Sequence, residues 1–171
     1  MMNLASFFIT LFIVFFSIGG YIIVGIFYPQ NEQLILWLTL FASSIKTILF
    51  VSNVMQKKLD IFEINSLTPN KHRIFVILAI LLILFSYSSD LTFIQFISPI
   101  HFEGIDTNLP LAELFFKMFF YTSHFFFWMG VVHIYPKSFP AEYITLMIST
   151  TTFITLAFST LRFITHKKNR T

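Results

Sequence analysis

Long apolar runs dominate the sequence and limit the folds that it can adopt. Four of them cover residues 4–27, 34–55, 74–96 and 140–161. A helix needs about 20 apolar residues to cross the roughly 30 Å hydrocarbon core of a bilayer, and each run reaches that length. Only 11% of the 171 residues are charged, whereas a soluble domain is about a quarter charged. We therefore predict an all-α, multi-pass protein of the cell membrane that contacts the lipid bilayer.

The first run lacks the features of a cleaved signal peptide. The segment MMNLASFFITLFIVFF has no basic residue, no small-residue cleavage site follows it, and the apolar run continues through Gly25. We expect this run to be retained as a transmembrane helix.

Basic residues gather on one side of the predicted membrane. The loop at 56–73 carries four Lys or Arg residues, and the tail at 162–171 is basic as well. Residues 89–113 carry four acids and neither Lys nor Arg. Because cytoplasmic loops of membrane proteins are enriched in Lys and Arg, we predict that 56–73 and the tail lie in the cytoplasm and that 89–113 lies outside.

The segment at 111–132 decides the topology. If it crossed the bilayer, the last run would carry the basic tail to the outside, as in a plain five-span protein. If it enters the membrane from outside and returns to the same side, both termini lie in the cytoplasm, and the basic tail favours this course. Non-helical backbone at membrane depth must be surrounded by protein or line a wet cavity. The prediction is therefore four transmembrane helices plus one re-entrant helix, in a symmetric homo-oligomer.

The run LFFKMFFYTSHFFFWMGVVHIYPKSFPAEYITLMISTTTFITLAFSTL at 114–161 carries a family resemblance. Residues 119–123 stand where a pore helix would lie, and IYP at 134–136 matches the segment that follows a selectivity filter. In these features the chain resembles the two-helix bacterial potassium-channel pore-domain family. The resemblance implies an outer helix at the third apolar run, a tetramer and a monovalent cation as the permeating species.

This resemblance also divides the chain in two. Residues 1–72 would hold two N-terminal transmembrane helices and a cytoplasmic loop. Residues 73–171 would hold the outer helix, the re-entrant segment and the inner helix of the channel-like module.

The filter positions depart from the family sequence. In place of the family's Thr-Val-Gly-Tyr-Gly-Asp, the chain has Trp128, Met129, Gly130, Val131, Val132 and His133. A filter turns backbone carbonyls toward the ion, which needs left-handed conformations that Gly adopts easily and that a β-branched Val avoids. With Val132 at the second Gly, the resemblance implies the scaffold without potassium selectivity. We expect an ion channel of changed selectivity or a non-conducting relative; the alternative is a multi-span interaction or regulatory protein with no pore.

Lys46 lies midway along the second run, where a charge costs on the order of 3 kcal/mol. Neither interface is within reach of its side chain, so it should face the protein interior or a wet cavity. Asp90 is the candidate carboxylate partner on a neighbouring helix. The alternative is a lysine satisfied by nearby hydroxyls and helix carbonyls, the hydroxyls being those of Ser43, Ser44 and Thr47.

Three histidines are weaker candidates for function. In a tetramer, His133 would form a ring at the outer mouth that titrates near neutral pH, and the alternative is an ordinary interfacial loop. We expect His124 to be packed or hydrogen-bonded and His101 to be solvated in the acidic loop. Their spacing fits no helical pair of metal ligands, so we predict no metal and no cofactor.

Two apolar or hydroxyl-rich stretches allow two uses each. The cluster of Trp128 with the phenylalanines at 125–127 could form an apolar constriction or pack between helices. The threonines at 150–152 could face a pore or a neighbouring helix.

Several function classes lack any signal in the sequence. There is no Gly-rich phosphate loop, no paired carboxylates and no nucleophile–base set, so we do not expect an enzyme. The chain has no Cys, and its net charge of +3 is too small to indicate nucleic acid.

Overall fold

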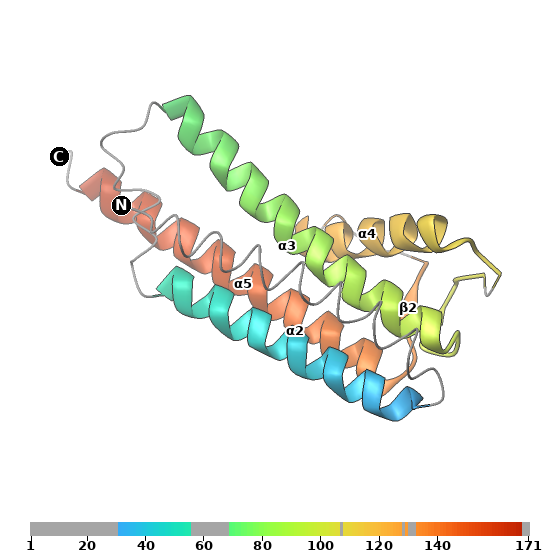
Figure 1. The fold of residues 1–171 in the computed structure, drawn as a ribbon. Coiled ribbons are helices and arrows are strands. Elements are labelled where there is room, and N and C mark those ends of the chain that lie inside the picture. The colour runs from blue at the N-terminus through green and yellow to red at the C-terminus, as the bar shows by residue number, and fades with distance from the viewer. Residues whose placement is uncertain (1–30, 56–68, 107, 128, 130–132, 169–171) are drawn as a thin grey trace.

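The computed structural model describes residues 31–55, 69–106, 108–127, 129 and 133–168. These residues are mostly helical, as predicted, and the predicted helix at 4–27 lies outside them. The elements follow one another in the order α2 (Glu32–Met55), α3 (Pro69–Ile97), β1 (Phe102–Glu103), α4 (Leu111–Phe127), β2 (Tyr135–Pro136) and α5 (Phe139–Lys168) (Figure 1).

Local sequence signals explain where the helices begin and end. α3 ends at Ile97 because Ser98 precedes Pro99, and a residue before proline avoids the helical conformation. α5 begins directly after Ser138, whose carbonyl accepts the Glu142 amide at 2.9 Å. Pro140 is tolerated in the first turn of α5, where an amide has no partner within the helix.

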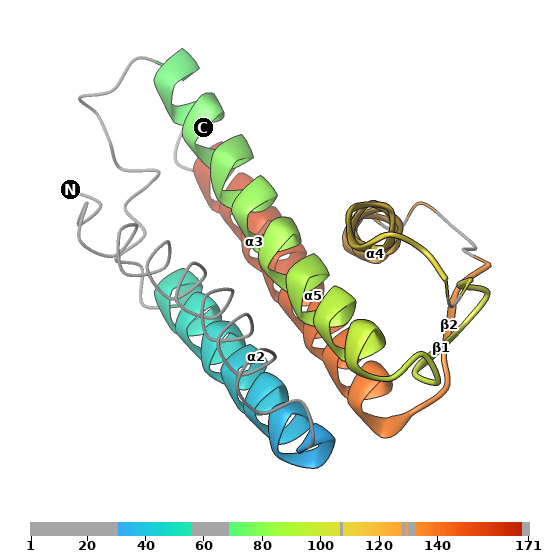
Figure 2. The same ribbon diagram turned by 45° about the vertical axis from the view of Figure 1, so that its right-hand side comes forward.

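The helices α2, α3 and α5 lie side by side and form the long body of the molecule (Figures 1 and 2). The start of α2, the end of α3 and the start of α5 lie together at one end of this body, which we call the outer end (Figure 1). α2 and α5 therefore run in the same direction, and α3 runs against both.

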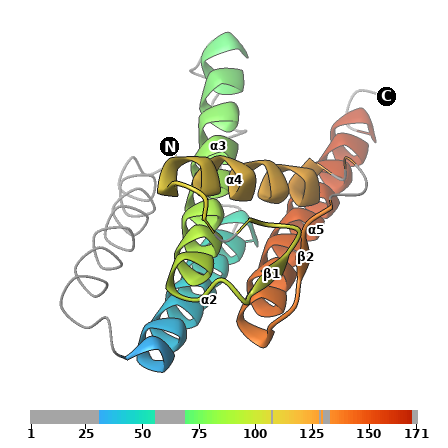
Figure 3. The ribbon, with the colours of Figure 1, turned by 90° about the vertical axis from the view of Figure 1, so that its right-hand side faces the viewer.

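The helix α4 crosses the body instead of running along it (Figure 3). The rings of Phe115 on α4 and Phe85 on α3 lie 4.9 Å apart between centroids. On the other side, the Tyr121 hydroxyl lies 3.1 Å from the Thr145 hydroxyl of α5. The chain reaches α4 from the end of α3 and rejoins the body at the start of α5, so it leaves and returns at the outer end.

Polar and apolar side chains on α2 are arranged opposite to those of a soluble helix. Trp37, Phe41 and Ile48 are 65–66% exposed, whereas Thr39 and Ser43 are fully buried. Among the described residues, two helical stretches are long and apolar enough to cross a bilayer, Glu32–Val51 and Ile80–Ile97. They belong to the predicted second and third runs; the predicted fourth run is helical as part of α5.

Most hydroxyls of the helices are satisfied within their own helix. Each donates to the carbonyl four residues earlier, a bond that lets Ser and Thr lie in apolar surroundings without water. This group comprises Thr39, Ser44, Thr47, Ser88, Ser89, Thr92, Thr122, Ser123, Thr145, Ser149, Thr150, Thr151, Thr152 and Thr155.

A short antiparallel pair, which the sequence analysis did not anticipate, joins the segments before and after α4. In the pair β1–β2, Phe102 lies opposite Pro136 and Glu103 lies opposite Tyr135. The Lys137 amide extends it by donating to the carbonyl of His101 at 2.9 Å. We call β1, β2 and this hydrogen bond the outer clasp. It fixes where the chain returns after α4.

Gly104 permits the close approach of the two segments in the outer clasp. Its φ of +83° is in the left-handed region, and a Cβ at this position would lie 2.0 Å from the carbonyl oxygen of His133. Only glycine avoids both the strained conformation and this collision.

Replacing Gly104 by Ala should lower the free energy of unfolding by more than about 1 kcal/mol. The left-handed conformation alone costs an L-residue roughly 1–2 kcal/mol, and the collision adds to it. Thermal unfolding in detergent measures the loss. Asn108→Ala, at an exposed position in the same loop, is the matched control and should change stability by less than about 0.5 kcal/mol. Equal stability of the two variants would contradict the geometry of the clasp.

Candidate functional site

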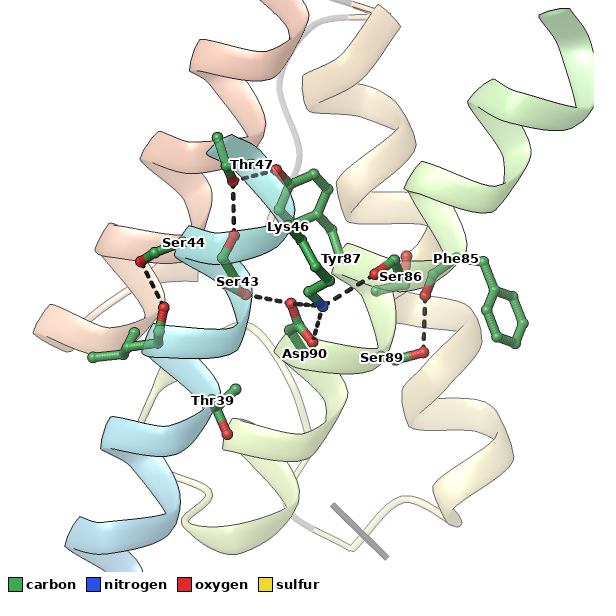
Figure 4. Close-up of polar contacts among 12 residues, drawn as sticks. Thr39, Ser43, Ser44, Lys46, Thr47, Phe85, Ser86, Tyr87, Ser89 and Asp90 are labelled. Atoms are coloured by element: carbon green, nitrogen blue, oxygen red, sulfur yellow. Dashed lines mark hydrogen bonds and ion pairs between the residues drawn. The ribbon is translucent and has the colours of Figure 1, made fainter. Parts of the chain in front are cut away.

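A buried ion pair joins α2 to α3 (Figure 4). The ammonium nitrogen of Lys46 lies 2.6 Å from Oδ1 and 2.5 Å from Oδ2 of Asp90. The Lys46 side chain is 8% exposed and that of Asp90 is fully buried. Two hydroxyls complete the group, since Lys46 also donates to Ser86 Oγ at 3.0 Å and Ser43 donates to Asp90. The structure thus brings together the two intramembrane charges that the sequence singled out.

The direction of the helices explains how the two charges meet. Helical side chains lean toward the N-terminus of their own helix. Lys46 on α2 therefore leans toward the outer end, and Asp90 on the antiparallel α3 leans away from it. Along the sequence, Asp90 lies nearer the outer end of its helix than Lys46 does. Because the two side chains lean toward each other along the bundle axis, they meet in spite of this difference in depth.

The alternative for Lys46, in which hydroxyls of its own helix accept the hydrogen bonds of its ammonium group, is not what the structure shows. Ser43 donates to Asp90, and Ser44 lies 2.8 Å from the Tyr143 hydroxyl of α5. Lys46 instead contacts the hydroxyl of Ser86, which the sequence analysis did not identify. Its position four residues before Asp90 places both side chains on one face of α3, and this spacing could have indicated it.

A second polar contact joins all three long helices. Tyr87 is 3% exposed. Its hydroxyl lies 2.6 Å from Thr47 Oγ1 on α2 and 2.9 Å from Thr151 Oγ1 on α5. Of the two uses considered for the threonines at 150–152, Thr151 has the contact with a neighbouring helix. Sequence analysis did not identify Tyr87, because a single tyrosine within an apolar run gives no signal of its partners.

The energetics of the ion pair follow from its burial. Each isolated ion costs several kcal/mol to transfer from water into an apolar interior, and a partner repays this only when further hydrogen bonds satisfy both groups. Here Ser43 and Ser86 supply those bonds. The pair as a unit is therefore tolerated, whereas removal of either partner leaves an uncompensated charge. The cluster therefore holds α2 and α3 in register.

The filter-like segment is described at two of its six positions. Met129 is 65% exposed, and its amide donates to the His124 carbonyl at 3.1 Å. His133 is exposed, and its carbonyl faces Gly104 in the outer clasp. The remaining four positions, Trp128, Gly130, Val131 and Val132, lie outside the described residues.

The expectation for His124 is confirmed and that for His101 is wrong. His124 packs against Phe120 with 4.0 Å between ring centroids, and its Nδ1 lies 3.0 Å from the Phe120 carbonyl, which agrees with the expectation that it is packed or hydrogen-bonded. The expectation that His101 is solvated is wrong: the residue is 3% exposed, and its Nδ1 lies 2.5 Å from Ser138 Oγ. The physical reason is the outer clasp, which folds the loop after α3 against the start of α5.

Burial also shifts the titration of His101. Desolvation lowers its pKa from the ordinary value of 6.5, and the negative charge of Glu32 opposes this effect. Within the described ranges, no group of three or more His, Asp or Glu side chains is arranged to hold a metal ion.

Removing one partner of the ion pair should be much more harmful than removing both. Lys46→Met and Asp90→Asn should each lower the free energy of unfolding by about 3–5 kcal/mol, and the double replacement by Met and Leu should recover most of that loss. Unfolding by a denaturing detergent measures all three variants.

Ser89→Ala is the matched control, since Ser89 neighbours Asp90 and bonds the Phe85 carbonyl of its own helix. It should leave stability nearly unchanged. If the double variant were no more stable than either single variant, the pair would not be the source of the loss.

Tyr87→Phe should cost about 1 kcal/mol, less than the loss of either charge. Hydrogen bonds between helices in membranes contribute about 0.6 kcal/mol on average. Thr47 and Thr151 also keep their bonds to the carbonyls of Ser43 and Met147. The same unfolding assay tests this order, and a cost equal to that of Asp90→Asn would contradict it.

Comparison of the chain with protein-family models, with curated proteins and with solved structures found no significant match. The resemblance to potassium-channel pore domains therefore stays a prediction that experiment must test.

Proposed function

We propose that this chain is a multi-pass membrane protein with a potassium-channel-like pore module. It acts as an ion channel of changed selectivity or as a non-conducting relative of such channels. In this proposal four helices span the bilayer, α4 is re-entrant, and both termini lie in the cytoplasm.

The course of the chain around α4 carries the proposal. α3 ends and α5 begins at the outer end, and α4 lies between them across the body (Figures 1 and 3). An outer helix, a transverse helix, an extended return and an inner helix are the order of elements in a channel pore domain. The sequence resemblance at 114–161 aligns with the same order.

Exposed apolar side chains on α4 and α5 support an assembly of several copies. On α4, Phe116 and Phe120 are 70% and 58% exposed, and on α5 Leu146 and Phe153 are 58% and 66% exposed. In a channel-like homo-oligomer these faces would meet neighbouring subunits or lipid. Any non-helical backbone at membrane depth would then be enclosed by protein, as such a depth requires.

The buried ion pair suggests a role for the N-terminal part of the chain. Lys46 ties α2 to α3, and Ser44 and Tyr143 tie α2 to α5. In the proposal, α2 is therefore a fixed support of the module rather than a separate domain.

A second candidate, a membrane interaction or regulatory protein without a pore, is favoured by the filter sequence. A filter needs backbone conformations that glycine adopts easily, and the chain has valine at 131 and 132 next to its single glycine there. Both candidates are multi-span membrane proteins, and only the channel of changed selectivity would pass a current.

Topology is the first test. A reporter enzyme that is active only outside the cytoplasm, fused after Thr171, should be inactive, because the proposed tail lies inside. The matched fusion after Asn108, in the loop between β1 and α4, should be active. Activity of both fusions would indicate a fifth crossing and would remove the basis for the channel comparison.

Conduction is the second test. Purified protein in planar bilayers should pass a cation current if it is a channel, and His133→Ala should then change the current or its dependence on pH, since the proposed tetramer would place four copies of this side chain at one mouth. His124→Ala is the control within the same module. Absence of current across ions and pH values would exclude the conducting channel and leave the non-conducting relative and the interaction protein.

A further inference from the structure

His101 occupies the junction of three elements at the outer end. Its carbonyl accepts the Lys137 amide at 2.9 Å, and its Nδ1 lies 2.5 Å from Ser138 Oγ directly before α5. The neighbouring residue Phe102 donates its amide to Gln95 Oε1 on α3 at 3.1 Å. The imidazole is therefore part of the contact that holds the outer clasp against α3 and α5.

The other ring nitrogen is the unusual feature. Nε2 of His101 is buried and has no hydrogen-bond partner among the residues that the structure describes. A neutral imidazole has one N–H donor and one acceptor nitrogen. When its hydrogen is on Nδ1 and is donated to Ser138 Oγ, Nε2 is left as an unpaired acceptor and no N–H group is buried without a partner. A protonated imidazole carries two N–H donors, and its second donor would face no acceptor within the described part of the chain.

We propose that His101 makes the outer clasp sensitive to acid, so that protonation of its imidazole releases the paired strands β1 and β2 from the start of α5. The proton comes from the solvent and is returned when the pH rises again. No covalent bond changes.

The nearby charge of Glu32 favours protonation of His101 less than burial disfavours it. Glu32 at the start of α2 attracts a positive ring, and burial outweighs it, so the pKa of His101 in the closed clasp is below 6.5. Glu103 on β1 and Lys137 after β2 are exposed and pair with each other at 3.2 Å, which reduces their net field. Glu142 in the first turn of α5 is exposed to solvent.

The sign of the pH effect follows from these positions. In the open clasp His101 is solvated, with a pKa near the ordinary value of about 6.5. Above that pH the ring is neutral in both states and the clasp is unaffected. As the pH falls below it, the proton binds the open state preferentially, and each unit of difference between the two pKa values favours opening about tenfold.

Thiol labelling can follow opening without any ion flux, so the test is independent of the proposed function. The chain has no Cys, which allows single cysteines to be introduced without other changes. Ile105→Cys reports opening, because Ile105 is 8% exposed next to Gly104. Asn108→Cys, at an exposed position, is the matched control for the effect of pH on maleimide chemistry itself.

The labelling rate at 105, divided by that at 108, should rise several-fold in reconstituted protein between pH 7.5 and pH 5. In the His101→Gln background the ratio should stay constant, because glutamine does not titrate. A constant ratio in the parent chain, or an equal rise in the His101→Gln chain, would overturn the proposal.

A second variant keeps the test decisive if His101→Gln folds poorly. Glu32→Gln retains His101 and Ser138 but removes the charge that favours the protonated ring in the closed state. The closed-state pKa of His101 then lies further below that of the open state, so the rise in the ratio of labelling rates at 105 and 108 between pH 7.5 and pH 5 should be larger than in the parent. A rise equal to or smaller than that of the parent would count against the proposal.

Discussion

The ion pair between Lys46 and Asp90 determines how α2 sits against the rest of the described bundle. An ammonium group near the middle of an apolar helix is costly in lipid and in a dry core alike. The ammonium group can be buried only when α2 is placed and rotated so that Lys46 reaches the carboxylate of Asp90. Tyr87 adds a second fixed point three residues before Asp90, with hydroxyl partners on both α2 and α5. Polar contacts thus set the register between helices whose apolar surfaces alone would allow sliding.

The interior of this bundle contains many hydroxyl-bearing side chains beside its apolar core, whereas large apolar side chains are exposed on the outside. Hydrogen bonds within each helix make that arrangement possible. Ser and Thr side chains bond the preceding turn of their own helix, so they are satisfied before any contact between helices forms. A few of them, among them Thr47, Thr151 and Ser44, also face a hydroxyl of another helix. Such contacts are individually weak in membranes. These contacts favour one arrangement of the helices over others that would bury a similar apolar area.

The outer end is held in a different way. There, backbone pairing between β1 and β2, a left-handed glycine and a buried histidine bring the two ends of the α4 excursion together. Since these parts lie before and after α4 in the chain, the clasp fixes the return point of the excursion. The helix itself is held by aromatic packing on α3 and by the contact of Tyr121 with Thr145 on α5.

Local features of the sequence were enough to predict the helices and the charge that needs a partner. The apolar runs predicted α2, α3 and α5, because length and hydrophobicity are local properties. The isolated charge of Lys46 indicated a buried carboxylate partner, with Asp90 as the candidate. The packing of the helices, by contrast, sets which hydroxyls complete the pair, joins three helices through Tyr87 and buries His101 at the outer clasp. Ser43 and Asp90 are 47 residues apart, and His101 and Ser138 are 37 apart. Contacts over such separations depend on how helices rotate and where loops fold back, which no local pattern encodes.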